Sequence, residues 1–165
     1  MRIGSLIIAI CFSFSLHAEK AIPLSFEVAS SPQEIMWGLM GRRHLPPDHG
    51  MLFVYPQEKF LAIWMFNTWI DLSLAFLDSN LRVLEIHEMK AYPEMMDPRR
   101  VVKSPRDLGL YSSGESIVQF FLNRSVHSSV PVKYALEMNK HWFSLRGVKI
   151  GDTLVLDKAP YFYQE

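Results

Sequence analysis

The sequence predicts an α+β fold: a mainly antiparallel or mixed β-sheet that is curled into a partial barrel and carries two short helices. Three observations lead to this fold class. Several short segments alternate apolar and polar residues, which is typical of strands. These segments outnumber those with helical periodicity. Short turns join neighbouring strands, which favours antiparallel pairing.

The first expected strand and the first expected helix follow one another closely. Apolar residues alternate through 21–29, as in a strand with one buried face. Ser31 and Glu34 then have the spacing of a capping box, with Pro32 at the first helical position. Gly41 suits the left-handed residue that ends a helix. The expected apolar face of this helix comprises Ile35, Met36, Leu39 and Met40.

Four strands are expected next. Segments 50–56 and 59–66 are short and rich in apolar and aromatic residues. Segments 71–78 and 81–89 meet at an Asp-Ser-Asn turn signal, and they form the clearest hairpin of the sequence.

Residues 90–131 are expected to form a long excursion over the surface, where functional residues are often found. One element fits within it, at 115–123. The prolines of the segment argue against longer elements. They are Pro93, Pro98, Pro105 and Pro131.

The C-terminal part returns to regular structure. Segment 132–138 is expected to be a strand, and Asn139 is expected to cap a short helix over 140–146 that ends at Gly147. A Gly-Asp turn then leads into a last strand within 150–156.

Length and charge limit the domain count and the partners. The 165 residues are enough for one domain and short for two. The formal net charge is zero, with 17 basic and 17 acidic residues. Nucleic acids and anionic membranes are bound by clustered Lys and Arg, so we expect neither as a partner.

Residues 1–18 have the pattern of a secretory signal peptide. Arg2 precedes an apolar run over 3–16 that is too short to span a bilayer, and Ala18 precedes the charged Glu19. We therefore expect an exported protein, periplasmic or secreted, with one mature domain over 19–165 and no membrane span after cleavage. A retained N-terminal anchor is the alternative.

Cys11 is the only cysteine, and it would leave with the signal peptide. The mature domain would then contain no thiol. This expectation excludes disulfides, thiol catalysis and zinc-thiolate sites from the mature domain.

Three blocks of the sequence are similar to the DUF192 family, domain of unknown function 192. The blocks are GLMGRRHLPPDHGMLFVYP, WMFNTWIDLSLAFLDSNLRVLEIHEM and KYALEMNKHWFSLRGVKIGDTL. The resemblance spans residues 24–156 and implies a compact, mostly β single domain, often exported, with no established activity. The connection between Tyr92 and Val132 is longer here than relatives tend to have.

A polar corner interrupts the apolar run over 63–78. Trp64, Asn67, Thr68 and Asp71 fall between two expected strands. Aromatic walls with a few convergent polar groups are typical of a pocket for a small polar ligand or a glycan. Alternatively, these short polar side chains bond backbone groups left unpaired where the ladder breaks.

Two other groups are candidates for a site. Glu85 and His87 face the same way in a strand, and such a pair can hold a metal or orient a base; otherwise both are solvated surface residues. Arg42 follows a helix C-terminus, where the dipole favours a cation, and it can also fork onto an anion.

Methionine thioethers can bind Cu(I), which makes the methionines a further candidate. Most of them occupy core-facing positions, where they fill gaps, and only Met95 and Met96 escape that account. We therefore expect no metal and no cofactor. The methionines beyond the signal are Met36, Met40, Met51, Met65, Met89, Met95, Met96 and Met138.

Three functional hypotheses follow. The first is an exported, non-catalytic domain that binds a small polar or glycan ligand at the corner containing Trp64, Asn67, Thr68 and Asp71. The second is an envelope assembly or interaction factor that uses residues 90–131 to bind another envelope protein. The third is a hydrolase of envelope material that uses Asp71 or Glu85 with His87, although no nucleophile motif accompanies them.

Overall fold

The computed structural model describes residues 19–21 and 24–155. The predicted signal peptide over 1–18, with Cys11, lies outside the described residues. The elements are β1 (Glu19–Ala21), β2 (Ser25–Ala29), α1 (Pro32–Trp37), β3 (His49–Lys59), β4 (Ala62–Ile63), β5 (Leu72–Leu77), β6 (Val83–Met89), the 3-10 helices η1 (Pro93–Met95) and η2 (Pro105–Leu110), α2 (Ser116–Leu122), β7 (Val126–His127), β8 (Val132–Asn139), α3 (Trp142–Leu145) and β9 (Thr153–Val155).

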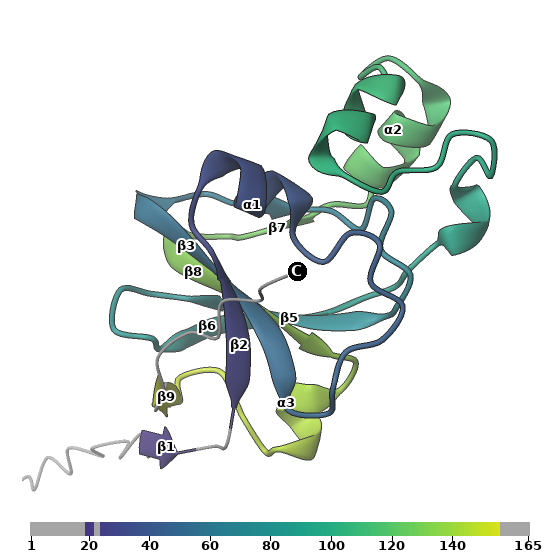
Figure 1. Ribbon diagram of the computed structural model, residues 1–165. Helices are drawn as coiled ribbons and strands as arrows, with labels where there is room; N and C mark the ends of the chain where they lie inside the picture. The colour runs from purple at the N-terminus through teal and green to yellow at the C-terminus, as the bar shows by residue number, and fades with distance from the viewer. Residues whose placement is uncertain (1–18, 22–23, 156–165) are drawn as a thin grey trace, which may run out of the picture.

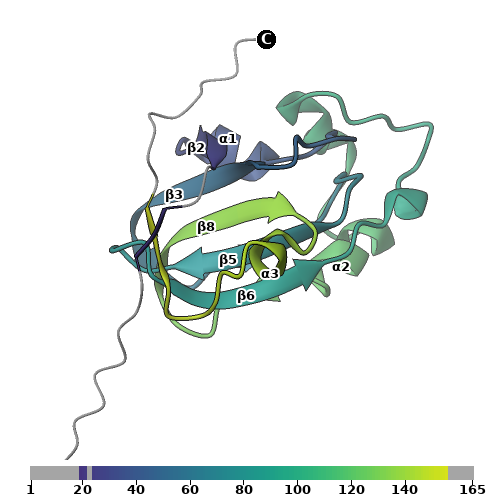
Figure 2. The ribbon, with the colours of Figure 1, turned by 90° about the horizontal axis from the view of Figure 1, so that it is seen from below.

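The centre of the molecule is a five-stranded mixed sheet with the order β2-β3-β8-β5-β6 (Figures 1 and 2). β2 is parallel to β3, and the other neighbours are antiparallel. The predicted hairpin is present as β5 and β6. Two smaller pairs, β1 with β9 and β4 with β7, stand beside this sheet. The α+β fold class is confirmed.

The predicted partial barrel is not confirmed, because the five-stranded sheet is open. Within the described residues β2 pairs only with β3, and β6 pairs within the sheet only with β5. Closing a barrel requires the two edge strands to pair with each other. Sequence periodicity predicts strands but not which strands lie at the edges.

Side chains of the sheet alternate between two covered faces. One face, called here the α1 face, carries Met51, Phe53 and Leu74 in a large apolar cluster. The opposite face, called here the α3 face, carries Leu52 and Leu136 in a second cluster. Figure 2 shows α3 in front of the strands β8, β5 and β6.

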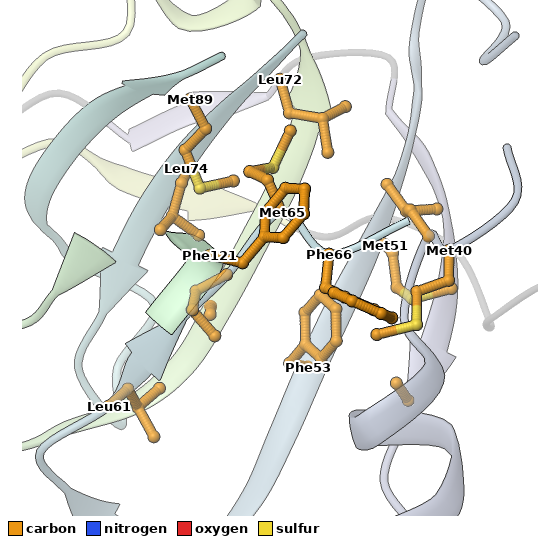
Figure 3. Close-up of a cluster of buried hydrophobic side chains, with 14 of the residues drawn as sticks. Met40, Met51, Phe53, Leu61, Met65, Phe66, Leu72, Leu74, Met89 and Phe121 are labelled. Atoms are coloured by element: carbon orange, nitrogen blue, oxygen red, sulfur yellow. The ribbon is translucent and has the colours of Figure 1, made fainter. Parts of the chain in front are cut away.

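The α1 face is covered by residues from three parts of the chain. Figure 3 shows the side chains of Phe66, Phe53 and Met40 pointing into one cluster. The ring of Phe66 also lies 5.1 Å from that of Tyr111 and 5.4 Å from that of Phe121. Residues from before, within and after the corner therefore share this core.

The 90–131 segment is consequently more than a surface excursion. It contains η1, η2, α2 and β7, and several of its side chains enter the core of the α1 face. Apolar side chains gain free energy by leaving water, so a long segment that carries several of them packs down. Its buried apolar residues are Ala91, Val102, Tyr111, Val118 and Phe121.

Helix α1 begins as predicted and ends earlier. The capping box of Ser31 and Glu34 is present. The helix ends at Trp37, because Gly38 adopts a left-handed φ of 50°, so the prediction that it continues to Gly41 is wrong. The turn buries Leu39 and Met40 but leaves Met36 45% exposed.

The predicted strand over 59–66 is largely absent. β3 runs on to Lys59, and only Ala62–Ile63 forms a short strand, β4. β3 is longer than predicted because it pairs with β8 past an irregularity between Val54 and Lys59. Residues from Trp64 onward leave the ladder and form the corner.

The predicted cap of the last helix is wrong. α3 starts after His141, which has a φ of 64°, while Asn139 is the last residue of β8. The Asn139 side-chain amide donates to the carbonyls of Leu45 and Pro46 instead, at 3.1 and 2.8 Å. The side chains of Trp142 and Phe143 are then buried against the α3 face.

None of the helices in the described ranges is long and apolar enough to cross a membrane.

Candidate functional site

Asn67 lies at the centre of the hydrogen bonds in the polar corner. It has a φ of 52°, a left-handed conformation that Asn adopts more readily than most residues. Its side-chain amide donates to the Val102 carbonyl at 3.1 Å, and its Oδ1 accepts from Trp69 Nε1 at 3.3 Å. Its own carbonyl accepts from the Gly41 amide at 2.8 Å. Asn67 therefore ties three distant segments together.

Asp71 joins the start of β5 to two other segments. Its carboxylate accepts from the Ala91 amide at 2.8 Å and from Lys140 Nζ at 2.9 Å. Burial acts to raise the pKa of Asp71, but the bonds from Lys140 and Ala91 outweigh it, so the pKa lies below its ordinary value. Asp71 is therefore an ionised residue that links the start of β5 to Ala91 and Lys140.

Glu85 and His87 share a face of β6, as the sequence predicts. His87 Nε2 lies 2.9 Å from one Glu85 oxygen, and the other oxygen accepts from the Ser129 amide and hydroxyl, each at 2.8 Å. Burial acts to raise the pKa of Glu85, but the Ser129 and His87 bonds lower it overall.

Of the two acids in the hydrolase hypothesis, the structure places Glu85 beside His87, at 2.9 Å, whereas Asp71 bonds other residues. The bonds of Asp71 go to Ala91 and Lys140, whereas Glu85 and His87 bond one another and Ser129. A general base needs its partner within hydrogen-bond reach. Among the described residues there is also no cluster of three or more His, Cys, Asp or Glu side chains suited to a metal.

Two of the cavities among the described residues share Trp37 and Met40 in their linings. The larger has a volume of about 810 Å³ and the smaller about 190 Å³. The predicted site residues divide between them. Arg42 and Asn67 line the larger, Trp64 and Thr68 line the smaller, and Asp71, Glu85 and His87 line neither.

The smaller cavity contains a carboxyl group that no sequence argument had selected. Glu137 lies on the inner strand β8, faces the α1 side, and is only 4% exposed. Within the described part of the chain its carboxyl makes no hydrogen bond or ion pair. Burial alone raises its pKa to about 8.

Glu137 had a weak sequence signal. It is an acid inside the apolar strand 132–138, on the same face as Ala135. Buried carboxyl groups are rare unless they are paired, so an acid at a core position of a predicted inner strand is a site candidate. The strand was predicted, but its inner position in the sheet was not.

Aromatic rings form much of the smaller cavity. Trp64 is held in place by stacking on Phe66, with centroids 5.1 Å apart and planes 20° from parallel. Tyr55 follows on β3, and burial, then the charge of Glu137, raises its pKa to about 12. Thr68 contributes a hydroxyl that is 3.5 Å from the Phe66 carbonyl.

The cations of the larger cavity mostly have partners within the molecule. Arg42 pairs with Glu27 at 2.6 Å, and Arg100 pairs with Glu115 at 2.6 Å. The Arg43 guanidinium lies 3.8 Å from the ring centre of Trp69. These contacts account for the arginines structurally.

A further set of hydrogen-bonded polar side chains lies at the start of β2 and β3, and the sequence did not predict it. His49 Nδ1 is 2.8 Å from Ser25 Oγ, and His49 Nε2 is 3.1 Å from Glu27, which also binds Arg42. Ser25 and His49 line neither cavity. The residues are 24 positions apart, so only the parallel pairing of β2 with β3 brings them together.

Comparison with known proteins agrees with the sequence resemblance. The model of the DUF192 family, described as Uncharacterized ACR, matches residues 15–156. Comparison with the curated proteins finds no match.

Two crystal structures are similar to the chain. One is a Sinorhizobium meliloti 1021 protein provisionally named a transcription regulator, with 31% identity, a TM-score of 0.57, and 79% of each chain covered. The other is a protein of unknown function from Novosphingobium aromaticivorans DSM 12444, with 24% identity and a TM-score of 0.58. The match covers 79% of this chain and 73% of that one, and at this identity it supports the fold alone.

Proposed function

The chain belongs to the DUF192 family, whose description assigns no activity, and from that premise we propose that it binds a small polar ligand, without chemical turnover, in the cavity around Glu137. The proposal keeps Trp64 and Thr68 from the predicted corner. It replaces Asn67 and Asp71 with Glu137 as the main polar group.

One observation supports this role above all others: Glu137 is buried and has no partner in the described structure. Among the described residues no fully enclosed side-chain nitrogen or oxygen atom lacks a hydrogen-bond partner, so the Glu137 carboxyl is open to the cavity, where a ligand can reach it. A core strand would be more stable with an apolar residue at this position. A carboxyl group that faces a cavity gains its partner when a ligand enters.

The composition of the lining favours binding over catalysis. Glu137 is the only charged side chain among the described residues that line the smaller cavity, and Thr68 is its only aliphatic hydroxyl. A nucleophile also needs a base within hydrogen-bond reach, and Thr68 instead contacts the Phe66 carbonyl.

The size of the cavity restricts the ligand. Drug-sized ligands occupy about 300–1,000 Å³. At about 190 Å³ the smaller cavity suits a small solute or one ring of a larger molecule. Trp37 and Trp64 are among the lining residues, and aromatic rings of this kind can contact a sugar ring or an organic ion.

Thermal denaturation with a panel of small solutes tests this function. We expect at least one sugar, alcohol, amide or amine to raise the melting temperature of the wild type, because ligands that bind only the native state stabilise it. Glu137→Gln should lose the shift. Glu58→Gln, at an exposed position on β3, is the matched control. No shift, or equal shifts in both variants, would contradict ligand binding at Glu137.

We also propose that the protein works outside the cytoplasm, as a periplasmic or secreted domain. The support is the sequence of residues 1–18, with its basic start, apolar run and small residue before Glu19. N-terminal sequencing of the protein from fractionated cells should find a chain that begins near Glu19. A chain that retains residues 1–18 in the cytoplasm would contradict export.

An interaction role for residues 90–131 is a second candidate. Apolar side chains stand exposed along this segment, with Val101 54%, Leu110 50% and Met95 38% exposed. Scattered exposed apolar residues are common, so the proposal needs a direct test. Cross-linking to an envelope protein in intact cells should disappear in Val101→Glu and persist in Ile150→Glu, an exposed residue elsewhere.

A further inference from the structure

The proposed ligand-binding role leads to a narrower inference, which rests on it. We infer that the smaller cavity selects a small organic cation, an ammonium or amidinium group, which pairs with the Glu137 carboxylate within the aromatic lining. The inference names the charge of the ligand, and it can fail while the binding role stands.

The charge of the lining is the first argument. No Lys, Arg or His is among the described residues that line the smaller cavity, and Glu137 is the one charged group. An anion there would meet a carboxyl group without a balancing cation. A cation would provide the partner that the fold leaves out, in a region of low dielectric where such a pair is strong.

The small number of polar side chains is the second argument. The side chains of the lining offer the Glu137 carboxyl, the hydroxyls of Thr68 and Tyr55, and the indole N–H groups of Trp37 and Trp64. A sugar ring carries several hydroxyls, and each one that is buried without a partner costs binding energy. An alkylammonium or amidinium has one polar head and needs fewer partners.

The aromatic walls are the third argument. Trp37 and Trp64 line the cavity together with Phe53 and Tyr55. The faces of aromatic rings carry negative potential, and tryptophan attracts cations most strongly. The same walls offer nothing comparable to an anion.

A proton should leave the cavity when the cation enters. Tyr55 on β3 is the only other titratable group in the described lining, and Leu74 on β5 is the other direct cross-strand neighbour of Glu137 besides Met51 on β3. With no cation nearby, burial raises the pKa of Glu137 to about 8. Without a bound cation, the Glu137 carboxyl is therefore mostly protonated at pH 7. Pairing with a cation requires the carboxylate, so a proton must leave.

This linkage predicts a pH signature that a neutral ligand lacks. Below the pKa of Glu137, the affinity for the cation should rise about tenfold per pH unit, because each unit increases the carboxylate fraction tenfold. Above it, the affinity should level off. A neutral ligand that accepts a hydrogen bond from the protonated acid should show the opposite trend.

Isosteric pairs of solutes provide the experiment. Acetamidine hydrochloride and acetamide have nearly the same shape, and only the first is a cation; ethanolamine hydrochloride and ethylene glycol form a second pair. Affinities are measured by calorimetry at pH 6, 7 and 8.5 and constant ionic strength. The wild type, Glu137→Gln and Glu58→Gln are compared, the last as control.

We expect a cation to bind the wild type and Glu58→Gln, about tenfold more tightly at pH 7 than at pH 6. Glu137→Gln should bind it at least tenfold more weakly. If acetamide, ethylene glycol or a sugar binds with dependence on Glu137 while neither cation does, the inference fails and the binding role stands. If nothing binds with dependence on Glu137, both fail.

A measurement on the wild type alone avoids any dependence on how the variant folds. Calorimetric titration of the cation at pH 7 in two buffers of different ionisation enthalpy gives the number of protons released. We expect close to one proton per cation bound. Binding without proton release would overturn the inference.

Discussion

Glu137 lies between Met51 of β3 and Leu74 of β5, at a position where an apolar side chain would complete the α1-face core. The whole sheet buries Glu137, but the free-energy cost of ionising it there arises from this one carboxyl group. A buried carboxyl with a raised pKa destabilises the native state when it ionises. Residues of this kind concentrate at functional sites.

The pH dependence of stability should reveal Glu137. Its pKa is about 8 in the folded protein and near the ordinary value of 4.5 in the unfolded chain. The raised pKa stabilises the fold below the unfolded value, and this contribution is lost as the pH rises toward 8. Relative to Glu137→Gln, the wild type should lose about 1 kcal/mol of unfolding free energy per pH unit across this window.

Urea denaturation of both proteins at pH 5, 6, 7, 8 and 9 measures this difference. The difference should level off above pH 8, where the folded and unfolded forms are both ionised. Parallel curves for the two proteins would show that Glu137 ionises normally. Glu58→Gln should follow the wild type throughout.

Asn67 has the second of the two roles that the sequence left open for the polar corner, the bonding of an otherwise unpaired backbone group. Its amide satisfies the Val102 carbonyl, and its left-handed backbone shapes the corner. Asn67→Ala should therefore lower the unfolding free energy by about 1–3 kcal/mol, because it leaves a buried carbonyl unpaired and strains the backbone. Chemical denaturation measures the loss, and a stability within 0.5 kcal/mol of wild type would contradict a structural role.

At the scale of elements, packing of apolar side chains into the core decides where a short helix ends. The capping box starts α1 at Pro32, as local sequence dictates. Gly38 ends it, since the chain must turn to insert Leu39 and Met40 into the core. The helix is therefore shorter than its apolar periodicity suggests.

Two glycines in this turn allow a matched test. A Cβ at Gly38 would lie 3.0 Å from Phe53 Cζ, whereas a Cβ at Gly41 would have no atom within 4 Å, and both residues have positive φ. Gly38→Ala should thus cost the backbone strain of about 1–2 kcal/mol and a steric penalty besides, and Gly41→Ala only the first. Equal losses of unfolding free energy would show that Phe53 moves aside freely.

At the scale of the whole molecule, the sheet is covered on both faces and the 90–131 segment completes one cover. Figure 1 shows α2 at the upper right, outside the central sheet. Even so, Phe121 of this helix is only 1% exposed. Its ring packs edge-on against Phe66 of the corner, so the segment and the candidate site share one core. Deleting 90–131 would expose that core.

Truncating Phe121 tests whether the segment is part of the fold. Phe121→Ala should lower the unfolding free energy by about 3–5 kcal/mol, because it leaves a cavity beside Phe66. Leu122→Ala, at the neighbouring 42% exposed position, is the control and should cost far less. Chemical denaturation compares them, and a small loss for Phe121→Ala would show that the segment is an accessory loop.

The candidate site was predicted only in part, for a physical reason. Trp64 and Thr68 stood out because polar and aromatic residues interrupt an apolar run, and both line the smaller cavity. Asn67 and Asp71 stood out for the same reason, but their side chains bond Val102, Ala91 and Lys140, residues 20 to 69 positions away. The same local pattern therefore produced both kinds of residue.

The sequence by itself determined what depends on neighbours along the chain: the α+β class, the β5–β6 hairpin, the capping box of α1 and the membership of the DUF192 family. Only the tertiary structure decided which strands are edges, where 90–131 packs, and that Glu137 is left without a partner in the described structure. Periodicity and turn chemistry are local properties. Isolation of a carboxyl group depends on every segment that surrounds it, and those segments meet only in the folded protein.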